Sequence, residues 1–236
     1  MNMKNESVGS ITGSATSEPG SENSFMKSVV SSALALWFVL VIFLGSQGAF
    51  VGSADSPPLP IFLGFAIPLA VFFAAYFGWG AFRTLILSAD LRFVTAIQAW
   101  RWGGLGFLSL YSYHVLPWLL AFPAGLGDMA IGISAPLMVL ELIRRPSFAA
   151  SRRYRVWNIL GLVDFVVALS MGTLCSGFFP GITRLIGNVT SSPMTQLPLV
   201  LIPAYMVPFF AMLHFTALFQ ARQLAGQKVT TPPRHP

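Results

Sequence analysis

Apolar residues along this chain gather into six long runs, separated by polar or proline-containing segments. Each run is close to the length of about 20 residues that a helix needs to cross a bilayer. The predicted helices cover residues 29–50, 60–86, 93–115, 124–143, 157–178 and 197–219. The pattern therefore predicts an all-α integral membrane bundle of about six transmembrane helices.

The two ends of the chain lie outside the predicted transmembrane domain of residues 28–222. Residues 1–27 are rich in Ser, Asn, Gly and Glu, and residues 223–236 are rich in proline. Such compositions predict tails that lack packed structure, because they offer little apolar surface to bury. The most apolar part of the first helix, residues 33–45, is also short enough for a signal peptide that would be cleaved near residues 52–54. Its polar leader is long for such a signal, so a retained anchor is favoured.

The composition excludes a water-soluble domain. Only 9% of the 236 residues are charged and 55% are hydrophobic, whereas a soluble domain carries about 25% charged residues. Cys175 is the only cysteine, so neither an intramolecular disulfide nor a cysteine-based metal cluster can form. The net charge of +6 comes from residues at predicted helix ends, not from one patch with interleaved aromatics, so no nucleic acid partner is expected.

The basic residues indicate how the helices are oriented, because positive residues in short loops stay on the cytoplasmic side. If the six helices cross the membrane in alternating directions, Arg184 is the one basic residue on one side of the membrane. The other side receives Lys4, Lys27, Arg83, Arg92, Arg101, Arg144, Arg145, Arg152, Arg153, Arg155, Arg222, Lys228 and Arg234. Both termini are therefore predicted to be cytoplasmic.

Ionisable residues inside predicted spans are the candidates for function, because hydrocarbon penalises them by about 2.5 to 3.5 kcal/mol for a central Asp, Lys or Arg. The candidates for a ligand site or proton path are Asp128, Asp164, His214, His114 and Arg101. Asp164 and His214 are each expected about 10 to 12 Å from the cytoplasmic ends of their helices, where they could pair. Gln98 and Asn158 could add hydrogen bonds in this inner layer.

Arg101 has two interpretations. It would join the inner layer if the third helix starts near Phe93. Its neighbours Trp100 and Trp102 favour an interfacial position instead, because Trp is enriched at the membrane surface and a long Arg side chain can reach the headgroups.

The outer layer contains His114 near the end of the third helix and Asp128 about one turn into the fourth. Because Asp128 follows Pro123 and Gly125, it lies where free N–H groups and the helix dipole would stabilise a carboxylate, so a capping role alone could explain it. His114 is expected to be an interfacial histidine without a special role.

The fourth and fifth helices share a spacing in which a glycine stands three residues before Asp128 and before Asp164. A small residue follows four later, which gives a smooth face for close helix packing. One Asp near each membrane face would fit an inverted repeat, but coincidence is favoured since the first three helices carry no matching pattern.

No cofactor is expected. Haem ligation by His114 and His214 is disfavoured because residue counting separates them by about 15 to 20 Å along the membrane normal. The glycines at residues 103, 104 and 106 follow no strand, so they are not a nucleotide fingerprint. No metal-binding or hydrolase motif occurs, which argues against an enzyme.

Three segments carry a resemblance to a known group. They are Pro123-Ala124-Gly125-Leu126-Gly127-Asp128, the segment from Trp157-Asn158 to Gly161-Leu162-Val163-Asp164, and Leu197-Pro198 to Ile202-Pro203. Over residues 95–220 the chain resembles uncharacterised bacterial multi-pass inner-membrane proteins with PAGxGD, WNxxGLxD and LPxxxIP segments. The resemblance implies a bacterial plasma membrane location and no particular activity.

Two hypotheses for function remain open. The first is a small-molecule or ion-coupled transporter, in which Asp128 and Asp164 bind protons or cationic ligands. The second is a non-transporting subunit, sensor or assembly partner of another membrane protein, in which the same residues hold helices together. In both cases the lipid bilayer is the principal partner.

Overall fold

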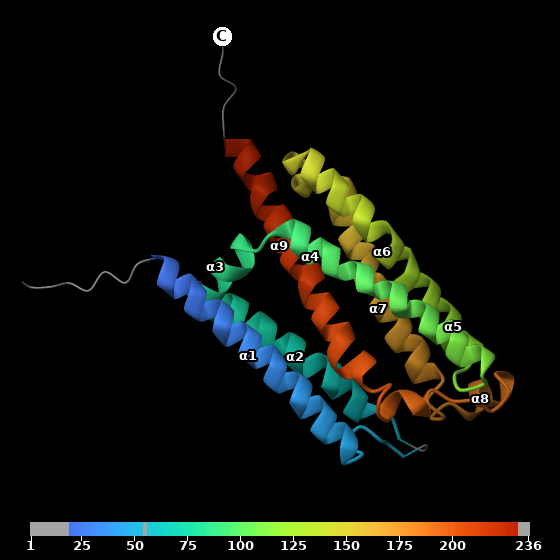
Figure 1. Cartoon of the computed structure of the whole chain (residues 1–236). Coiled ribbons are helices and arrows are strands. Elements are labelled where there is room, and N and C mark those ends of the chain that lie inside the picture. Colours follow the sequence, from blue (N-terminus) through green and yellow to red (C-terminus); the bar gives the residue numbers. More distant parts are fainter. Residues whose placement is uncertain (1–18, 54–55, 231–236) are drawn as a thin grey trace, which may run out of the picture.

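The computed structural model describes residues 19–53 and 56–230, and these fold into an all-helical bundle (Figure 1). The long helices are α1 (Pro19–Ser46), α2 (Leu59–Gly78), α6 (Trp118–Arg144), α7 (Arg152–Leu174) and α9 (Val207–Thr230). The shorter elements are α3 (Gly80–Ser88), α4 (Leu91–Ile97), η1 (Gln98–Gly104), α5 (Leu105–Ser112), η2 (Pro146–Ala150), α8 (Pro180–Leu185), η3 (Ser192–Thr195) and η4 (Ile202–Met206).

Within the described ranges, five helices are long and apolar enough to cross a membrane. They are Ser24–Ser46, Leu59–Gly78, Trp118–Arg144, Arg152–Leu174 and Ile202–Gly226, the last of which joins the π-helical η4 to α9. The predicted third helix, residues 93–115, is present as a composite. α4, the 3-10 segment η1 and α5 follow one another without a gap and form one rod beside α6 (Figure 1).

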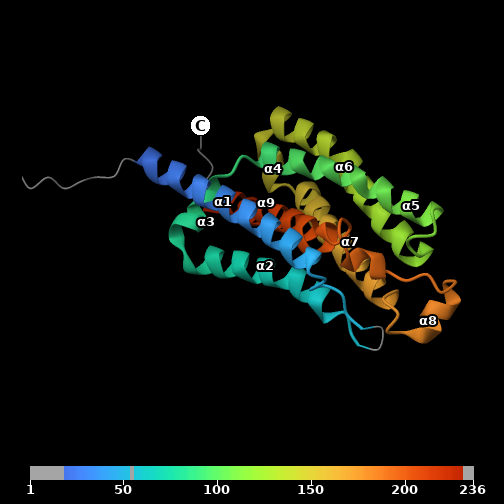
Figure 2. The same cartoon turned by 60° about the horizontal axis from the view of Figure 1, so that its bottom comes forward.

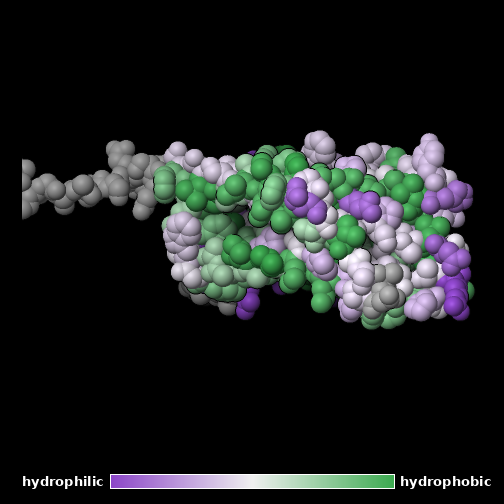
Figure 3. Space-filling view, turned by 90° about the horizontal axis from the view of Figure 1, so that it is seen from below, coloured by the Kyte–Doolittle hydropathy of each residue, from purple (hydrophilic) through white to green (hydrophobic). Residues whose placement is uncertain are grey.

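α9 occupies the middle of the bundle. It runs between α1 and α2 on one side and α6, α7 and the α4–η1–α5 rod on the other (Figures 1 and 2). Half of its most apolar window is buried, against 6% for α1. Large apolar side chains stay exposed on the outer helices, among them Leu36, Ile67, Leu137 and Val166. Hydrophobic residues also cover much of the surface seen from below (Figure 3), as a lipid-facing surface requires.

Several helix bounds differ from the predicted ones. The second helix breaks at Trp79, whose backbone is extended (φ −123, ψ 107) between two glycines, because glycine is a weak helix former. The predicted tails are partly helical: α1 begins at Pro19 and α9 ends at Thr230. The tail predictions for residues 1–18 and 231–236 lie outside the described residues.

The difference with the greatest effect on the site concerns the fourth helix, whose predicted first residue is Ala124. α6 begins at Trp118, directly after Pro117, and Pro123 lies inside it. Proline can occupy a membrane helix because neighbouring helices compensate for the missing hydrogen bond. Asp128 therefore lies ten residues after the first residue of α6, and the interpretation of Asp128 as a helix cap is wrong.

One end of the bundle collects most of the described basic residues. Five of them lie at the end of α6, in the α6–α7 connection and at the start of α7: Arg144, Arg145, Arg152, Arg153 and Arg155. Gln220 of α9 donates to the backbone oxygens of Ile86 and Ala89, at 2.8 and 2.9 Å, so the α3–α4 connection lies beside the last turns of α9. Arg184 lies in α8, at the opposite end (Figure 1).

The turn before α4 lies outside the candidate spans and contains a helix cap. Asp90 accepts a hydrogen bond from the backbone nitrogen of Arg92 at 2.9 Å, and the Arg92 guanidinium donates to both carboxylate oxygens, at 3.1 and 3.0 Å. The guanidinium first, and the backbone N–H second, hold the pKa of the Asp90 carboxyl below its usual value. The cap is therefore made by the ionised carboxylate.

We expect Asp90→Ala to lower the free energy of unfolding by about 1 kcal/mol at neutral pH, the usual cost of losing a cap. Because the folded pKa of Asp90 is below the unfolded one, the stabilisation is present above the unfolded value of about 3.9 and is lost as the pH falls through the folded value. Unfolding curves of the wild type and of Asp90→Ala, recorded at several pH values, measure the gap between their free energies of unfolding. Asp90→Asn, which keeps a cap acceptor, is the control, and a gap between wild type and Asp90→Ala that persists in acid would contradict the assignment.

Candidate functional site

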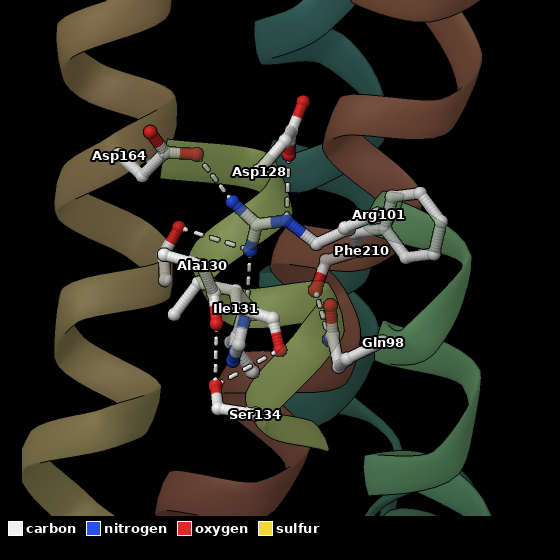
Figure 4. A network of polar contacts seen from close by, with 10 residues as sticks. Gln98, Arg101, Asp128, Ala130, Ile131, Ser134, Asp164 and Phe210 are labelled. Carbon is white, nitrogen blue, oxygen red and sulfur yellow. Dashed lines mark hydrogen bonds and ion pairs between the residues drawn. The ribbon is translucent and has the colours of Figure 1, made fainter. Parts of the chain in front are cut away.

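The centre of the bundle holds a charged cluster around Arg101, which projects from η1. Only 2% of this residue is exposed. Its Nε donates to Oδ1 of Asp128 at 2.7 Å, and its Nη2 donates to Oδ2 of Asp164 at 2.5 Å. The guanidinium thus joins carboxylates from α6 and α7, and Figure 4 shows both acids directed at it.

The remaining guanidinium nitrogen binds two further groups. Nη1 of Arg101 lies 2.9 Å from Nε2 of His214, on α9, and donates to the carbonyl oxygen of Gly161 at 3.3 Å. The Phe165 ring lies under the guanidinium, with its centroid 3.9 Å from Cζ. A single side chain therefore links η1 to α6, α7 and α9.

These contacts correct two interpretations of the sequence. Arg101 is not interfacial: Trp100 and Trp102 are exposed while Arg101 points inward, because successive residues of a helix point in different directions. Asp128 does not belong to an outer layer, since the early start of α6 brings it to the depth of Asp164. Asp164 and His214 do share one layer, but they meet through Arg101.

The hydrogen-bond partners of His214 fix its protonation pattern. Arginine can only donate, so Nε2 of His214 accepts and the ring proton is on Nδ1. Nδ1 then donates to Oδ1 of Asn158 at 2.9 Å, and Nδ2 of Asn158 donates to the carbonyl of Tyr154 at 2.9 Å. His214 is thus a neutral, completely buried ring held between a cation and an amide.

Further polar contacts extend from the cluster toward the Arg-rich end. The hydroxyls of Tyr154 and Thr95 lie 2.7 Å apart and tie α7 to α4, and Trp157 donates to Ser134 at 2.8 Å to tie α7 to α6. Gln98 Nε2 donates to the carbonyl of Phe210 at 3.1 Å. The role of Asn158 agrees with the sequence prediction, whereas Tyr154 and Thr95 gave no signal, because a tyrosine within an arginine-rich segment looks interfacial.

Glycines allow the helices to approach this closely. A Cβ on Gly132 of α6 would collide with backbone atoms of Arg101 and Trp102, and a Cβ on Gly161 of α7 would collide with the His214 ring. The small-residue spacing noted in the sequence does therefore lie at helix contacts. It places both acids in one layer, however, and not one near each membrane face.

The charges of the cluster do not balance. Two carboxylates face one guanidinium and a neutral imidazole, so the cluster carries one excess negative charge when both acids are ionised. The Arg101 side chain is 1% exposed, and those of Asp128 and Asp164 are 16% and 10% exposed. An unbalanced charge in such surroundings favours uptake of a proton or a cation.

His114 lies apart from this cluster. It is exposed, with a left-handed backbone conformation (φ 57), in the turn between α5 and α6. Among the side chains that the structure describes, residues 24–53 and 56–226, no three or more of His, Cys, Asp or Glu are grouped so that they could hold a metal ion.

Fold and cluster together define the class: an all-helical protein with membrane-length apolar helices and a buried arginine shared by two acids. Residues 58–222 match the family described as a domain of unknown function, DUF8737, and the chain belongs to that family. The matched region begins just before α2 and ends within α9, so it includes the whole cluster but not α1. Neither a curated protein nor a solved structure matches the chain.

Proposed function

We propose that this protein is a multi-pass protein of the bacterial inner membrane with both termini in the cytoplasm, and that it transports a small molecule or ion in exchange for a proton or another cation. The apolar helices support a membrane location. The basic residues at one end of the bundle support the orientation. The resemblance of its segments to bacterial inner-membrane proteins is the basis for naming that membrane.

The single observation that carries the transport proposal is the excess carboxylate of the Arg101 cluster. A purely structural link between helices needs one acid for one guanidinium, because an additional buried charge costs free energy. Here Asp128 and Asp164 compete for one partner, and each uses only one oxygen in its bond to Arg101. A proton or monovalent cation would balance the cluster, and its release would restore the charge.

A second candidate is supported by the same geometry. Every nitrogen of the Arg101 guanidinium is already engaged, and the bonds join η1, α6, α7 and α9. In a non-transporting subunit, sensor or assembly partner, this cluster would lock the four elements together and bind nothing further.

Exchange measurements in liposomes separate the two candidates. We expect the purified protein to change the pH inside dye-loaded liposomes when a gradient of Na⁺, K⁺ or a small organic ammonium ion is imposed. Asp128→Asn and Asp164→Asn should slow this exchange by at least about tenfold, since each removes the excess charge.

Glu141→Gln is the matched control, because Glu141 is another α6 carboxylate and pairs with Arg145 near the helix end, at 3.7 Å. It should exchange at the wild-type rate. If wild-type liposomes respond like empty ones to all three gradients and the Asn variants differ only in folded yield, the transport proposal fails and the structural candidate is favoured.

A further inference from the structure

The start of α7 carries three exposed arginines, Arg152, Arg153 and Arg155, with buried Tyr154 between them. Among the described side chains, no carboxylate pairs with any of the three. The acids whose side chains the structure describes all pair with other arginines: Asp90 with Arg92, Asp128 and Asp164 with Arg101, and Glu141 with Arg145. The three residues therefore form a patch of unbalanced positive charge, the α7 arginine patch.

An exposed apolar surface continues from this patch along α7. The exposed residues from Val156 to Val166 are all apolar, and they are Val156, Ile159, Leu160, Val163 and Val166. Over this stretch the helix rises about 15 Å, at about 1.5 Å per residue. That length is about half of the 30 Å hydrocarbon thickness of a bilayer, so the surface matches the acyl chains of one leaflet.

The spacing of the arginines suits a phosphate group. Arg152 and Arg155 are three residues apart, which places their Cβ atoms about 5 to 6 Å from each other on the helix surface. A guanidinium binds phosphate through two parallel N–H donors, so two guanidinium groups at this spacing can hold one phosphate. A choline headgroup would bring a second cation against them, whereas a glycerol headgroup would not.

We propose that the α7 arginine patch and the apolar surface beside it form a binding site for an anionic phospholipid whose headgroup carries no cation, such as phosphatidylglycerol. The rule that basic residues stay on the cytoplasmic side accounts for arginines anywhere at this end of the bundle. A lipid site requires in addition that the arginines of α7 select the headgroup. The proposal rests on the proposed membrane location but not on transport.

Native mass spectrometry of the detergent-purified protein measures the binding of single lipid molecules. The protein is titrated with phosphatidylglycerol and, separately, with phosphatidylcholine that has the same acyl chains. We expect phosphatidylglycerol to bind at least about tenfold more tightly, because its phosphate meets the guanidinium groups with no opposing cation. Equal affinities for the two lipids would overturn the proposal.

Arg152→Gln combined with Arg155→Gln locates the site. This double variant should bind the two lipids with similar affinity, because glutamine has no charge to offer the phosphate. Arg83→Gln combined with Arg222→Gln is the matched control, since both arginines are exposed, on α3 and α9, and the protein again loses two positive charges. The control should keep the preference for phosphatidylglycerol. A preference that survives in the α7 variant, or that disappears from both variants, would refute the site.

Glycerol 3-phosphate distinguishes a lipid site from a site for a soluble phosphate, because it carries the phosphate group without acyl chains. A roughly hundredfold excess of this compound should displace little phosphatidylglycerol, since the apolar surface contributes only to binding of the lipid. Displacement of most of the lipid would make a soluble phosphate the occupant and overturn the proposal.

Fluorescence quenching by bromine tests the apolar half of the site. In phosphatidylcholine nanodiscs with a small fraction of phosphatidylglycerol brominated in its acyl chains, we expect Val163→Trp to be quenched more strongly than Ile133→Trp. Both positions are exposed, and they lie equally far along the chain from Arg152 and from Arg144, so they probe similar depths. Equal quenching would place the lipid elsewhere and refute the site. Failure to enter nanodiscs would instead contradict the membrane location, which the two-lipid titration does not test.

Discussion

Arg101→Met is expected to lower the free energy of unfolding by about 3 to 5 kcal/mol, the typical cost of removing one partner of a buried ion pair. The variant leaves Asp128 and Asp164 without a cation and Nε2 of His214 without a donor. Total stabilities are about 5 to 15 kcal/mol, so this loss should appear as a sharp fall in folded yield. Denaturant unfolding in detergent and the monodisperse fraction after purification measure it.

Arg222→Met is the matched control, because Arg222 is exposed on α9 and the same substitution there should change little. Combining Arg101→Met with Asp128→Asn and Asp164→Asn should recover most of the loss, since the unpaired charges are then gone. If Arg101→Met were as stable as the wild type, or if the combined variant recovered no stability, charge pairing would not be what holds this layer together.

Gly132→Ala is the second substitution with a large expected effect. The added methyl group would overlap backbone atoms of Arg101 and Trp102, which cannot rotate away as a side chain can. We expect a loss of about 1 to 3 kcal/mol from overpacking, together with displacement of η1 from α6 and a weaker bond between Arg101 and Asp128. Thermal unfolding in detergent and disulfide trapping between cysteines introduced into η1 and α6 would report both effects.

Gly103→Ala provides the comparison, since a Cβ at Gly103 meets no atom within 4 Å. Alanine is the better helix former by about 0.5 to 1 kcal/mol, so this variant should be as stable as the wild type or slightly more so. If Gly132→Ala were equally harmless, this result would contradict a close contact between η1 and α6 at Gly132.

The sequence predicted the helices better than it predicted the cluster. Apolar runs alone placed the membrane-length helices, because a helix needs a minimum number of apolar residues to cross a bilayer. The predicted helix ends were less accurate where a proline was interpreted as the boundary of a helix. Pro123 looked like the edge of a loop, yet it lies inside α6, because proline is tolerated where neighbouring helices supply hydrogen bonds.

That one boundary decided the interpretation of Asp128. Counted from a helix that starts at Ala124, the acid belongs to the first turn. Counted from Trp118, it lies deep in the bundle. Depth along a helix follows from its first residue, and composition identifies that residue poorly.

The partners of Arg101 could not be predicted from spacing. Trp100 and Trp102 are exposed, but a helix has more than one side, and neighbouring residues give little information about where the residue between them points. The contacts of Arg101 involve residues 27, 63 and 113 positions away, on three other helices. Such contacts depend on how helices cross, which local pattern does not specify.

The same separations bear on how the protein is made. Arg101 leaves the ribosome 27 residues before Asp128. His214 is synthesised much later, 113 residues after Arg101. A lone arginine costs about 2.5 to 3.5 kcal/mol during insertion by the translocon. The α4–η1–α5 rod and α6 should therefore enter the bilayer as a hairpin, with Asp128 as the first counter-ion. The layer is completed only when α9, which is synthesised after η1, α6 and α7, moves in between these helices.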